Sequence, residues 1–255
     1  MITSVMTEMG GVGKSSIIFN LAWYMATKGK KILLIDLDPQ RANLSYLCGV
    51  KDIDNKSGIY DIIVDDGLSI KDVICEVKEN LYIVPANENA KYLPLLFEKA
   101  ERRENLLKDI IKPVKNQYDY IFIDTNPTPS IIHIVSLVAS DNVIIPLLPD
   151  AKSMEGTKAI VDTYEAVKQS LNKKLEVLAL VYNQKDKRKR FLTASQSAIN
   201  MFCDLKGLRV AKTEIASNAP ISETFLFKKG ITELDRRSIG SKNLIELAEE
   251  LFDVK

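Results

Sequence analysis

Residues 9–15, with the sequence MGGVGKS, constrain the fold more than any other stretch of this chain. They follow an apolar run, residues 2–6, that can form a strand, and they precede residues 16–27, whose apolar side chains recur at helical spacing. Glycines let backbone N–H groups converge on phosphate oxygens, and the N-terminus of a following helix adds partial positive charge. A strand, a glycine-rich turn and a helix in this order predict a phosphate-binding loop.

The polar residues of this loop have separate expected roles. Lys14 is expected to reach the β- and γ-phosphates of a nucleotide, and the Ser15 hydroxyl to bind Mg²⁺. The full motif has glycine where this chain has Glu8, and a tight turn without a ligand is the alternative for so short a pattern. The flanking strand and helix favour the loop. The predicted nucleotide-binding residues are Gly10, Gly11, Val12, Gly13, Lys14, Ser15 and Ser16.

Two further predicted strands end in carboxylates. Residues 31–35 are apolar at every position except the first, which is typical of a central parallel strand, and they lead into Asp36 and Asp38. Residues 118–124 form a similar run that ends at Asp124. Because ligands bind at the carboxyl ends of strands in open α/β sheets, we expect all three acids beside the loop. Asp124 is then the acid that orients Mg²⁺, while helix capping is the alternative for Asp38.

Strands and helices alternate along the chain, which predicts an α/β fold with a doubly wound, mostly parallel sheet flanked by helices. We expect one domain over residues 1–255, because no Pro/Gly/Ser-rich linker divides it. Residues 41–79 are expected to be helical, residues 210–215 to form an edge strand and residues 243–252 the last helix. His133, the only histidine, falls on a predicted apolar helix, where a packed neutral imidazole is favoured over a catalytic one.

Charge and cysteine content restrict the partners. Lys plus Arg number 35 and Asp plus Glu 34, so only a local patch could attract nucleic acid. Three widely spaced cysteines without a C-x-x-C pattern, and no apolar run near ~20 residues, predict a cytoplasmic protein with no membrane association. A solvated loop is the alternative for the basic run at residues 185–190. The residues expected to contact DNA phosphates are Lys187, Arg188, Lys189, Arg190, Lys228 and Lys229.

Three motifs together resemble a known family: GGVGKS at residues 10–15, DLDPQ at 36–40 and DTNP at 124–127. They are similar to the deviant Walker-A P-loop ATPases, and specifically to the ParA partition group, over nearly the whole chain. The resemblance implies ATP binding with Mg²⁺, a homodimer formed on ATP binding, and non-specific DNA binding on the nucleoid. It further implies hydrolysis stimulated by a ParB-like centromere-binding adaptor protein, in the segregation of plasmid or chromosomal DNA.

The resemblance also implies roles for single residues. Lys14 and Asp38 are the expected catalytic residues, with Asp38 orienting the attacking water. Asp36 and Asp124, with the loop serine, organise the Mg²⁺ shell. Asn183 is similar to the adenine-contacting asparagine of the family.

This sequence departs from the family pattern at several positions. Met9 replaces the signature lysine that reaches the phosphates of a partner subunit, which predicts slow hydrolysis. Asn126 stands where the family has a proline, and Ala216 and Ser217 where many relatives have Pro-Arg. The chain begins at its first predicted strand, so no N-terminal helix-turn-helix domain is expected.

Three alternative functions follow from related families. A MinD-like membrane-associated division-site regulator is disfavoured, because the polar face of the last helix carries Glu246, Glu249 and Glu250, which anionic lipid would repel. A redox protein like the nitrogenase iron protein would need cluster cysteines at positions that this chain does not match. A non-hydrolysing ATP-dependent scaffold stays open because of Met9.

Overall fold

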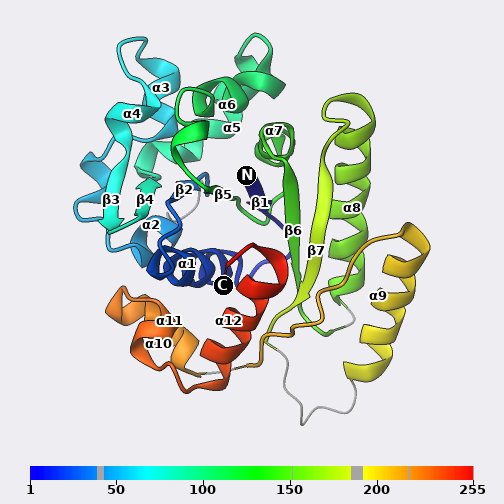
Figure 1. Cartoon of the computed structure of the whole chain (residues 1–255). Coiled ribbons are helices and arrows are strands. Elements are labelled where there is room, and N and C mark those ends of the chain that lie inside the picture. Colours follow the sequence, from blue (N-terminus) through cyan, green and yellow to red (C-terminus); the bar gives the residue numbers. More distant parts are fainter. Residues whose placement is uncertain (39–42, 151, 185–191, 218, 255) are drawn as a thin grey trace.

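The computed structural model describes residues 1–38, 43–150, 152–184, 192–217 and 219–254. In these residues seven strands form one sheet, in the order β3-β4-β2-β5-β1-β6-β7 (Figure 1). Neighbouring strands pair in parallel except β3, which is antiparallel to β4. The strands are β1 (Ile2–Val5), β2 (Ile32–Asp36), β3 (Cys75–Lys78), β4 (Leu81–Val84), β5 (Tyr120–Asp124), β6 (Asn142–Leu147) and β7 (Glu176–Tyr182).

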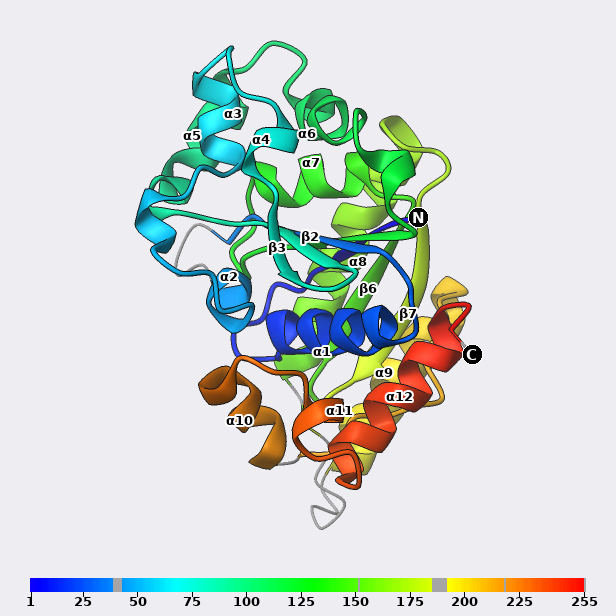
Figure 2. The same ribbon diagram turned by 60° about the vertical axis from the view of Figure 1, so that its left-hand side comes forward.

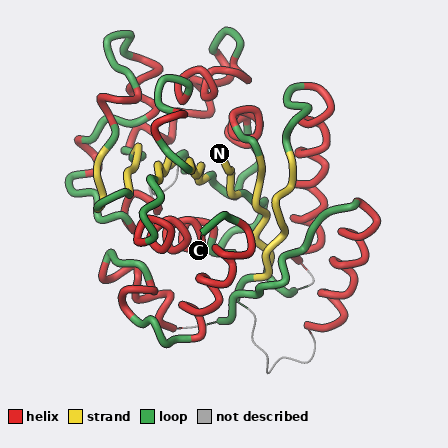
Figure 3. The backbone as a smooth tube through the Cα atoms, in the orientation of Figure 1, coloured by secondary structure: helices red, strands yellow, loops and turns green. Residues whose placement is uncertain are grey.

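Helices cover both faces of the sheet (Figure 3). On one face α1 contacts α12, with α10 and α11 beside them (Figure 2), while α3 to α7 cover the other face and α8 and α9 flank β6 and β7. The predicted doubly wound α/β fold is therefore confirmed. The helices are α1 (Lys14–Thr27), α2 (Asn43–Leu47), α3 (Ile59–Val64), α4 (Ile70–Val73), α5 (Leu93–Lys99), α6 (Arg103–Ile111), α7 (Ile131–Ala139), α8 (Lys152–Ser170), α9 (Leu192–Lys206), α10 (Ala219–Phe227), α11 (Ile231–Leu234) and α12 (Ile239–Leu251).

The apolar sequence of β2 follows from its place in the middle of the sheet. Ile32 and Leu34 pack in the cluster that includes α1 and α12, whereas Leu33 and Ile35 pack in the cluster under α5 to α7. All four side chains are fully buried. Successive side chains of a strand point to opposite faces, so a strand covered by helices on both sides is apolar at every position.

Two predictions of secondary structure were wrong. The region expected to be helical, residues 41–79, contains the edge strand β3 in addition to short helices. β3 has only four residues, mostly half-buried, so its alternation is too brief to detect in the sequence. Residues 210–215 make a single bridge, Leu180 to Val210, and run beside β7 through the bond from the Ile215 N–H to the Tyr182 carbonyl (2.8 Å).

The last helix begins at Ile239, four residues earlier than predicted. Ser238 is its N-cap, because the Ser238 hydroxyl accepts a hydrogen bond from the Ser241 N–H (3.2 Å). A serine at this position satisfies one of the N–H groups that a helix leaves unpaired at its start.

Candidate nucleotide-binding site

The glycine-rich loop connects β1 to α1. Gly11 and Gly13 have φ angles of +75° and +85°, in the left-handed region that glycine enters without a steric cost. Gly13 is the N-cap of α1, and it has no side chain that could accept from the first N–H groups of the helix. Such N–H groups at a helix N-terminus attract anions. The predicted order of strand, glycine turn and helix is therefore confirmed.

The sheet register brings the three predicted acids together. Asp36 and Asp124 are paired across β2 and β5, and Asp124 is paired with Val5 at the end of β1. Asp38 lies two residues beyond β2, and its N–H donates to Asp36 Oδ1 (3.1 Å). All three acids are buried. The strand ends thus place them beside the loop, as expected.

Asp36 mainly holds the backbone that surrounds the site. Its Oδ2 atom accepts hydrogen bonds from the Ser45 N–H (2.9 Å) and the Ser45 hydroxyl (2.7 Å), in addition to the bond from Asp38 at Oδ1. Burial raises the pKa of Asp36 to about 6, although these donors act in the opposite direction. Asp36 therefore anchors α2 behind the site, and its part in a Mg²⁺ shell stays a prediction.

Asp124 is chemically suited to a bound cation. Its side chain is fully buried, and neither carboxylate oxygen accepts a hydrogen bond of good geometry from the described residues. Burial and the negative charge of Asp36 raise its pKa to about 8, while the neighbouring Ser15 hydroxyl and Lys14 ammonium lower it. A buried carboxylate without partners is costly, and Mg²⁺ prefers oxygen ligands. The donor set of Asp124 and Ser15 therefore fits this ion.

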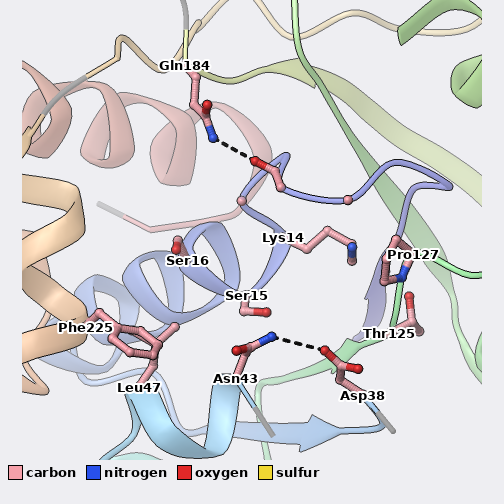
Figure 4. A pocket seen from close by; sticks show the side chains of 13 residues that line it. Lys14, Ser15, Ser16, Asp38, Asn43, Leu47, Thr125, Pro127, Gln184 and Phe225 are labelled. Atoms are coloured by element: carbon pink, nitrogen blue, oxygen red, sulfur yellow. Dashed lines mark hydrogen bonds between the residues drawn. The ribbon is translucent and has the colours of Figure 1, made fainter. Parts of the chain in front are cut away.

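Lys14 lies among these acids. Its side chain is 8% exposed, and it points towards the segment that carries Thr125 and Pro127 (Figure 4). Burial lowers the pKa of Lys14, while the charges of Asp124 and Asp38 raise it. A desolvated ammonium at the start of a helix is a strong site for a phosphate group.

A cavity of about 450 Å³ opens above the loop. The sequence did not identify Asn43, Leu47, Gln184 and Phe225 as part of it, because their helices and turns carry no motif. Asn43 also donates from Nδ2 to Asp38 Oδ2 (3.2 Å). The lining residues are Gly10, Gly11, Gly13, Lys14, Ser15, Ser16, Asp38, Asn43, Leu47, Thr125, Pro127, Gln184 and Phe225 (Figure 4).

Asn183 lies behind the loop and not in the cavity wall. Its Nδ2 atom donates to the carbonyl of Val12 (2.7 Å), which is itself buried and not part of the cavity wall. The predicted contact of Asn183 with adenine stays a prediction. The next residue, Gln184, reaches the cavity and donates from Nε2 to the carbonyl of Gly11 (2.9 Å).

Met9 packs on helix α8. A Cβ atom added to Gly156 would lie 2.7 Å from Met9 Cγ and 3.2 Å from Met9 Sδ, so the methionine side chain occupies the space above this glycine. The thioether has no charge and no N–H or O–H group. In this structure position 9 therefore contributes packing and no cation.

The predicted DNA-contacting cations divide into three groups. Residues 187–190 lie outside the described residues. Lys229 is exposed and pairs with Glu233 (Nζ to Oε1, 2.7 Å). The Lys228 Nζ is buried over the rings of Tyr46 and Phe225 without a hydrogen-bond partner in the described chain, so this structure does not present it to DNA phosphates, and its predicted contact stays a prediction.

His133 is buried on α7, next to the segment that follows Asp124. Its Nε2 atom lies 2.9 Å from the carbonyl of Asn126, so Nε2 carries the proton in this contact. Burial lowers the pKa of His133, and the Lys14 charge acts in the same direction. The prediction of a packed, neutral imidazole agrees with this environment.

The acidic face of α12 takes part in packing. Glu249 accepts a hydrogen bond from the Tyr24 hydroxyl (3.2 Å), and Glu250 accepts from the Lys212 and Thr213 N–H groups (2.9 and 2.8 Å). These carboxylates connect the C-terminal helix to α1 and to the segment beside β7. No helix in the described ranges has the length and apolar character needed to cross a membrane.

Several known proteins are similar to this chain in sequence. A family model described as an AAA domain matches residues 1–177. The chain is 32% identical to the sporulation initiation inhibitor protein Soj of Bacillus subtilis, over 98% of this chain and 97% of Soj. It is 27% identical to the chromosome partitioning protein ParA of Caulobacter vibrioides, over 98% of this chain and 93% of ParA.

A solved structure shows the same architecture with a nucleotide. The septum site-determining protein MinD from Pyrococcus horikoshii, complexed with Mg-ADP, matches with a TM-score of 0.77 at 24% identity, over 98% of this chain and 94% of MinD. This match shows the fold, while the family model and the relative Soj show the family. The chain belongs to the family of P-loop ATPases that includes Soj and ParA.

Proposed function

We propose that this chain is a nucleotide-switched ATPase that binds Mg²⁺-ATP in the cavity above the glycine-rich loop. The observation that carries the proposal is the convergence of Lys14, Asp38 and the unpartnered carboxylate of Asp124 on this loop. The complex of MinD with Mg-ADP supports it. When bound, Mg²⁺ neutralises phosphate charge, and the Ser15 hydroxyl and Asp124 would hold it.

Lys14 and Asp38 have separate roles in the proposed hydrolysis. Lys14 binds the terminal phosphates and stabilises the charge that develops during transfer. Asp38 accepts a hydrogen bond from the water that attacks the γ-phosphorus; Asn43 Nδ2 donates to its carboxylate, and its own N–H donates to Asp36 Oδ1. As the water oxygen bonds to the γ-phosphorus, the bond from the γ-phosphorus to the bridging oxygen breaks, ADP leaves, and the proton lost by the water passes to the phosphate product.

The biological role in this proposal is DNA segregation. The ATP-bound chain forms a homodimer, binds DNA without sequence preference on the nucleoid, and releases it when a ParB-like centromere-binding adaptor stimulates hydrolysis. The names of the relatives Soj and ParA, which describe sporulation and chromosome partitioning, support this role. Co-sedimentation with DNA, and not with anionic liposomes, is expected in the presence of ATP.

Hydrolysis is expected to be slow. Met9 stands where the family has its signature lysine, and the methionine packs on Gly156 without offering a donor. Cations supplied across an interface to a transferring phosphoryl group are worth on the order of 10³ to 10⁵ in rate. We therefore expect a long-lived ATP-bound dimer, unless another cation replaces the missing ammonium. If hydrolysis is slow enough to be negligible, the chain acts as a non-hydrolysing scaffold.

The Lys14→Ala variant tests the proposed site. We expect it to lose measurable ATP binding in titration calorimetry with Mg²⁺, and to remain monomeric in sedimentation with ATP. The matched control is Lys28→Ala, which removes an exposed lysine just beyond the other end of the same helix. Unchanged ATP affinity and ATP-dependent dimerisation of the Lys14 variant would refute the site.

A further inference from the structure

Two consecutive side-chain amides bind carbonyl groups of the glycine-rich loop. Asn183 donates from Nδ2 to the Val12 carbonyl (2.7 Å), and Gln184 donates from Nε2 to the Gly11 carbonyl (2.9 Å). Figure 4 shows the second bond, with Gln184 at the cavity wall above the loop. Both residues follow the end of β7, more than 170 positions along the chain from the carbonyls that they bind.

By holding two carbonyl groups, these contacts also fix the direction of the N–H groups that follow them. A trans peptide places its C=O and the following N–H on opposite sides, and the described residues contain no cis peptide. A bond that holds the Gly11 carbonyl towards Gln184 therefore turns the Val12 N–H the other way. The bond to the Val12 carbonyl does the same for the Gly13 N–H. Carbonyl oxygens turned towards phosphates would repel them, whereas N–H groups bind them.

The Asn183 amide is itself held in one orientation, whereas Gln184 is exposed and its amide is held through Nε2. Asn183 is 5% exposed, its N–H donates to the Leu147 carbonyl (2.8 Å), and its Oδ1 accepts from the Gln184 N–H (2.9 Å). With Oδ1 engaged by a donor and Nδ2 by an acceptor, the reversed amide would lose both bonds. A Cβ on Gly13 would lie 2.5 Å from Asn183 Nδ2, so this packing leaves no room for a side chain.

Gln184 also has an uncommon backbone conformation. Its φ angle of +54° lies in the left-handed region, which residues other than glycine adopt rarely and at a cost. This conformation accompanies both the N–H bond to Asn183 and the side-chain bond to Gly11.

We propose that Gln184 is a positioning residue for phosphate binding: at the cavity wall it holds the Gly11 carbonyl towards its own amide, so that the Val12 N–H of the same peptide group points to the opposite side and is available to a phosphate. The inference rests on the proposed nucleotide-binding function and assigns Gln184 to the phosphate end of the ligand. A residue that contacted the base would act on the nucleoside end instead. Ligands with and without a nucleoside therefore distinguish the two roles.

The test uses Gln184→Met in the full chain, because methionine has similar length and no donor. Dissociation constants are measured with Mg²⁺ for ADP and for inorganic tripolyphosphate. Loss of one hydrogen bond predicts about 2- to 10-fold weaker binding of both ligands by the same factor. The matched control is Gln196→Met, which removes a similar side-chain bond, to Glu214 (2.6 Å), at a site that does not line the cavity. We expect the control to bind both ligands as the unmodified chain does.

Each other outcome overturns the inference. Weaker binding of ADP with unchanged binding of tripolyphosphate would show a contact with the nucleoside. Unchanged binding of both ligands, with or without a lower melting temperature of the free variant, would show a role in stability or none. If the unmodified chain binds neither ligand, the proposed function is itself refuted and this inference falls with it.

Discussion

Some ionisable side chains around the cavity are buried without enough oppositely charged or hydrogen-bonding partners among the described residues of the free protein. Lys14 has its pKa lowered by burial, and Asp124 has its pKa raised for the same reason. These side chains cost stability when no ligand is bound. An arriving Mg²⁺-nucleotide supplies the missing opposite charges, so part of its binding energy comes from relieving this cost.

The His133→Gln variant tests the buried imidazole through pH. In the folded chain the pKa of His133 is below 6.5, the ordinary value for histidine. As the pH falls below 6.5, the imidazole therefore binds a proton in the unfolded chain before it does so in the folded chain. Stability from this group is thus present above pH 6.5 and is lost as the pH falls. Glutamine can still donate to the Asn126 carbonyl but does not titrate.

Urea unfolding at pH 7, 6 and 5 measures this difference. The unmodified chain should lose stability relative to His133→Gln on acidification, by at most about 1.4 kcal/mol per pH unit. Comparing the two proteins cancels the titration of the other groups. Parallel pH dependences would contradict the buried, neutral state of His133.

Met9 is the residue expected to limit turnover. In Met9→Lys an ammonium becomes available at the position where the resemblance to the ParA group implies a signature lysine, so we expect ATP hydrolysis in the presence of DNA to be at least about tenfold faster. Met9→Leu is the control, because it changes the apolar side chain without adding charge. Equal rates for the unmodified chain and Met9→Lys would show that another cation has this role.

The acidic face of helix α12 stabilises the fold, because one of its carboxylates accepts hydrogen bonds from a neighbouring segment. Burial alone would raise the pKa of Glu250, but the donors around it lower the pKa below the ordinary value. These donors are the Lys212 and Thr213 N–H groups and the Arg209 guanidinium (Nη2 to Oε1, 3.0 Å). The segment that runs beside β7 is therefore attached to the C-terminal helix in part through this carboxylate, in addition to the bond from the Ala216 N–H to Asn243 Oδ1 (3.2 Å).

The Glu250→Gln variant is expected to weaken this attachment. An amide replaces one acceptor oxygen with a donor, so at least one backbone N–H is left facing an N–H group. We expect the free energy of unfolding to fall by about 1–3 kcal/mol, the range for hydrogen bonds to charged groups. Glu246→Gln, at an exposed position of the same helix, should change it by less than about 0.5 kcal/mol in the same denaturant titration. Similar effects of the two substitutions would contradict the structural role of Glu250.

For the whole molecule, a net charge of +1 gives little long-range attraction to DNA. Affinity for DNA must come from a local group of cationic side chains, which is present twice when two chains form a dimer. Lys228 does not offer an exposed charge, which leaves the prediction to Lys229 and to residues 187–190.

Neutralising Arg188 and Arg190 together should weaken ATP-dependent DNA binding equally for unrelated sequences and reduce its salt dependence. Fluorescence anisotropy at several salt concentrations measures both effects. The control is the double neutralisation of Arg102 and Arg103, an exposed pair at the start of α6. Loss of binding confined to one DNA sequence, or none, would contradict the non-specific patch.

The core of the candidate site could be predicted from the sequence because its signals are local. A strand pattern followed by glycines and Lys14 indicates a loop, and an apolar run that ends in Asp124 indicates a central strand with an acid at its carboxyl end. The doubly wound topology then brings such ends to one edge of the sheet. The brief strand β3 was missed because four residues carry too little alternation.

By itself, the sequence determined the fold class, the glycine-rich loop and the three acids beside it, since hydrophobic periodicity and glycine conformation act over a few neighbouring residues. Only the tertiary structure decided that Asn183 lies behind the loop, that Gln184 holds the Gly11 carbonyl, that Met9 packs on Gly156 and that the Lys228 ammonium is buried. The physical reason is that these contacts join side chains far apart in the chain, whose positions depend on how helices pack on both faces of the sheet.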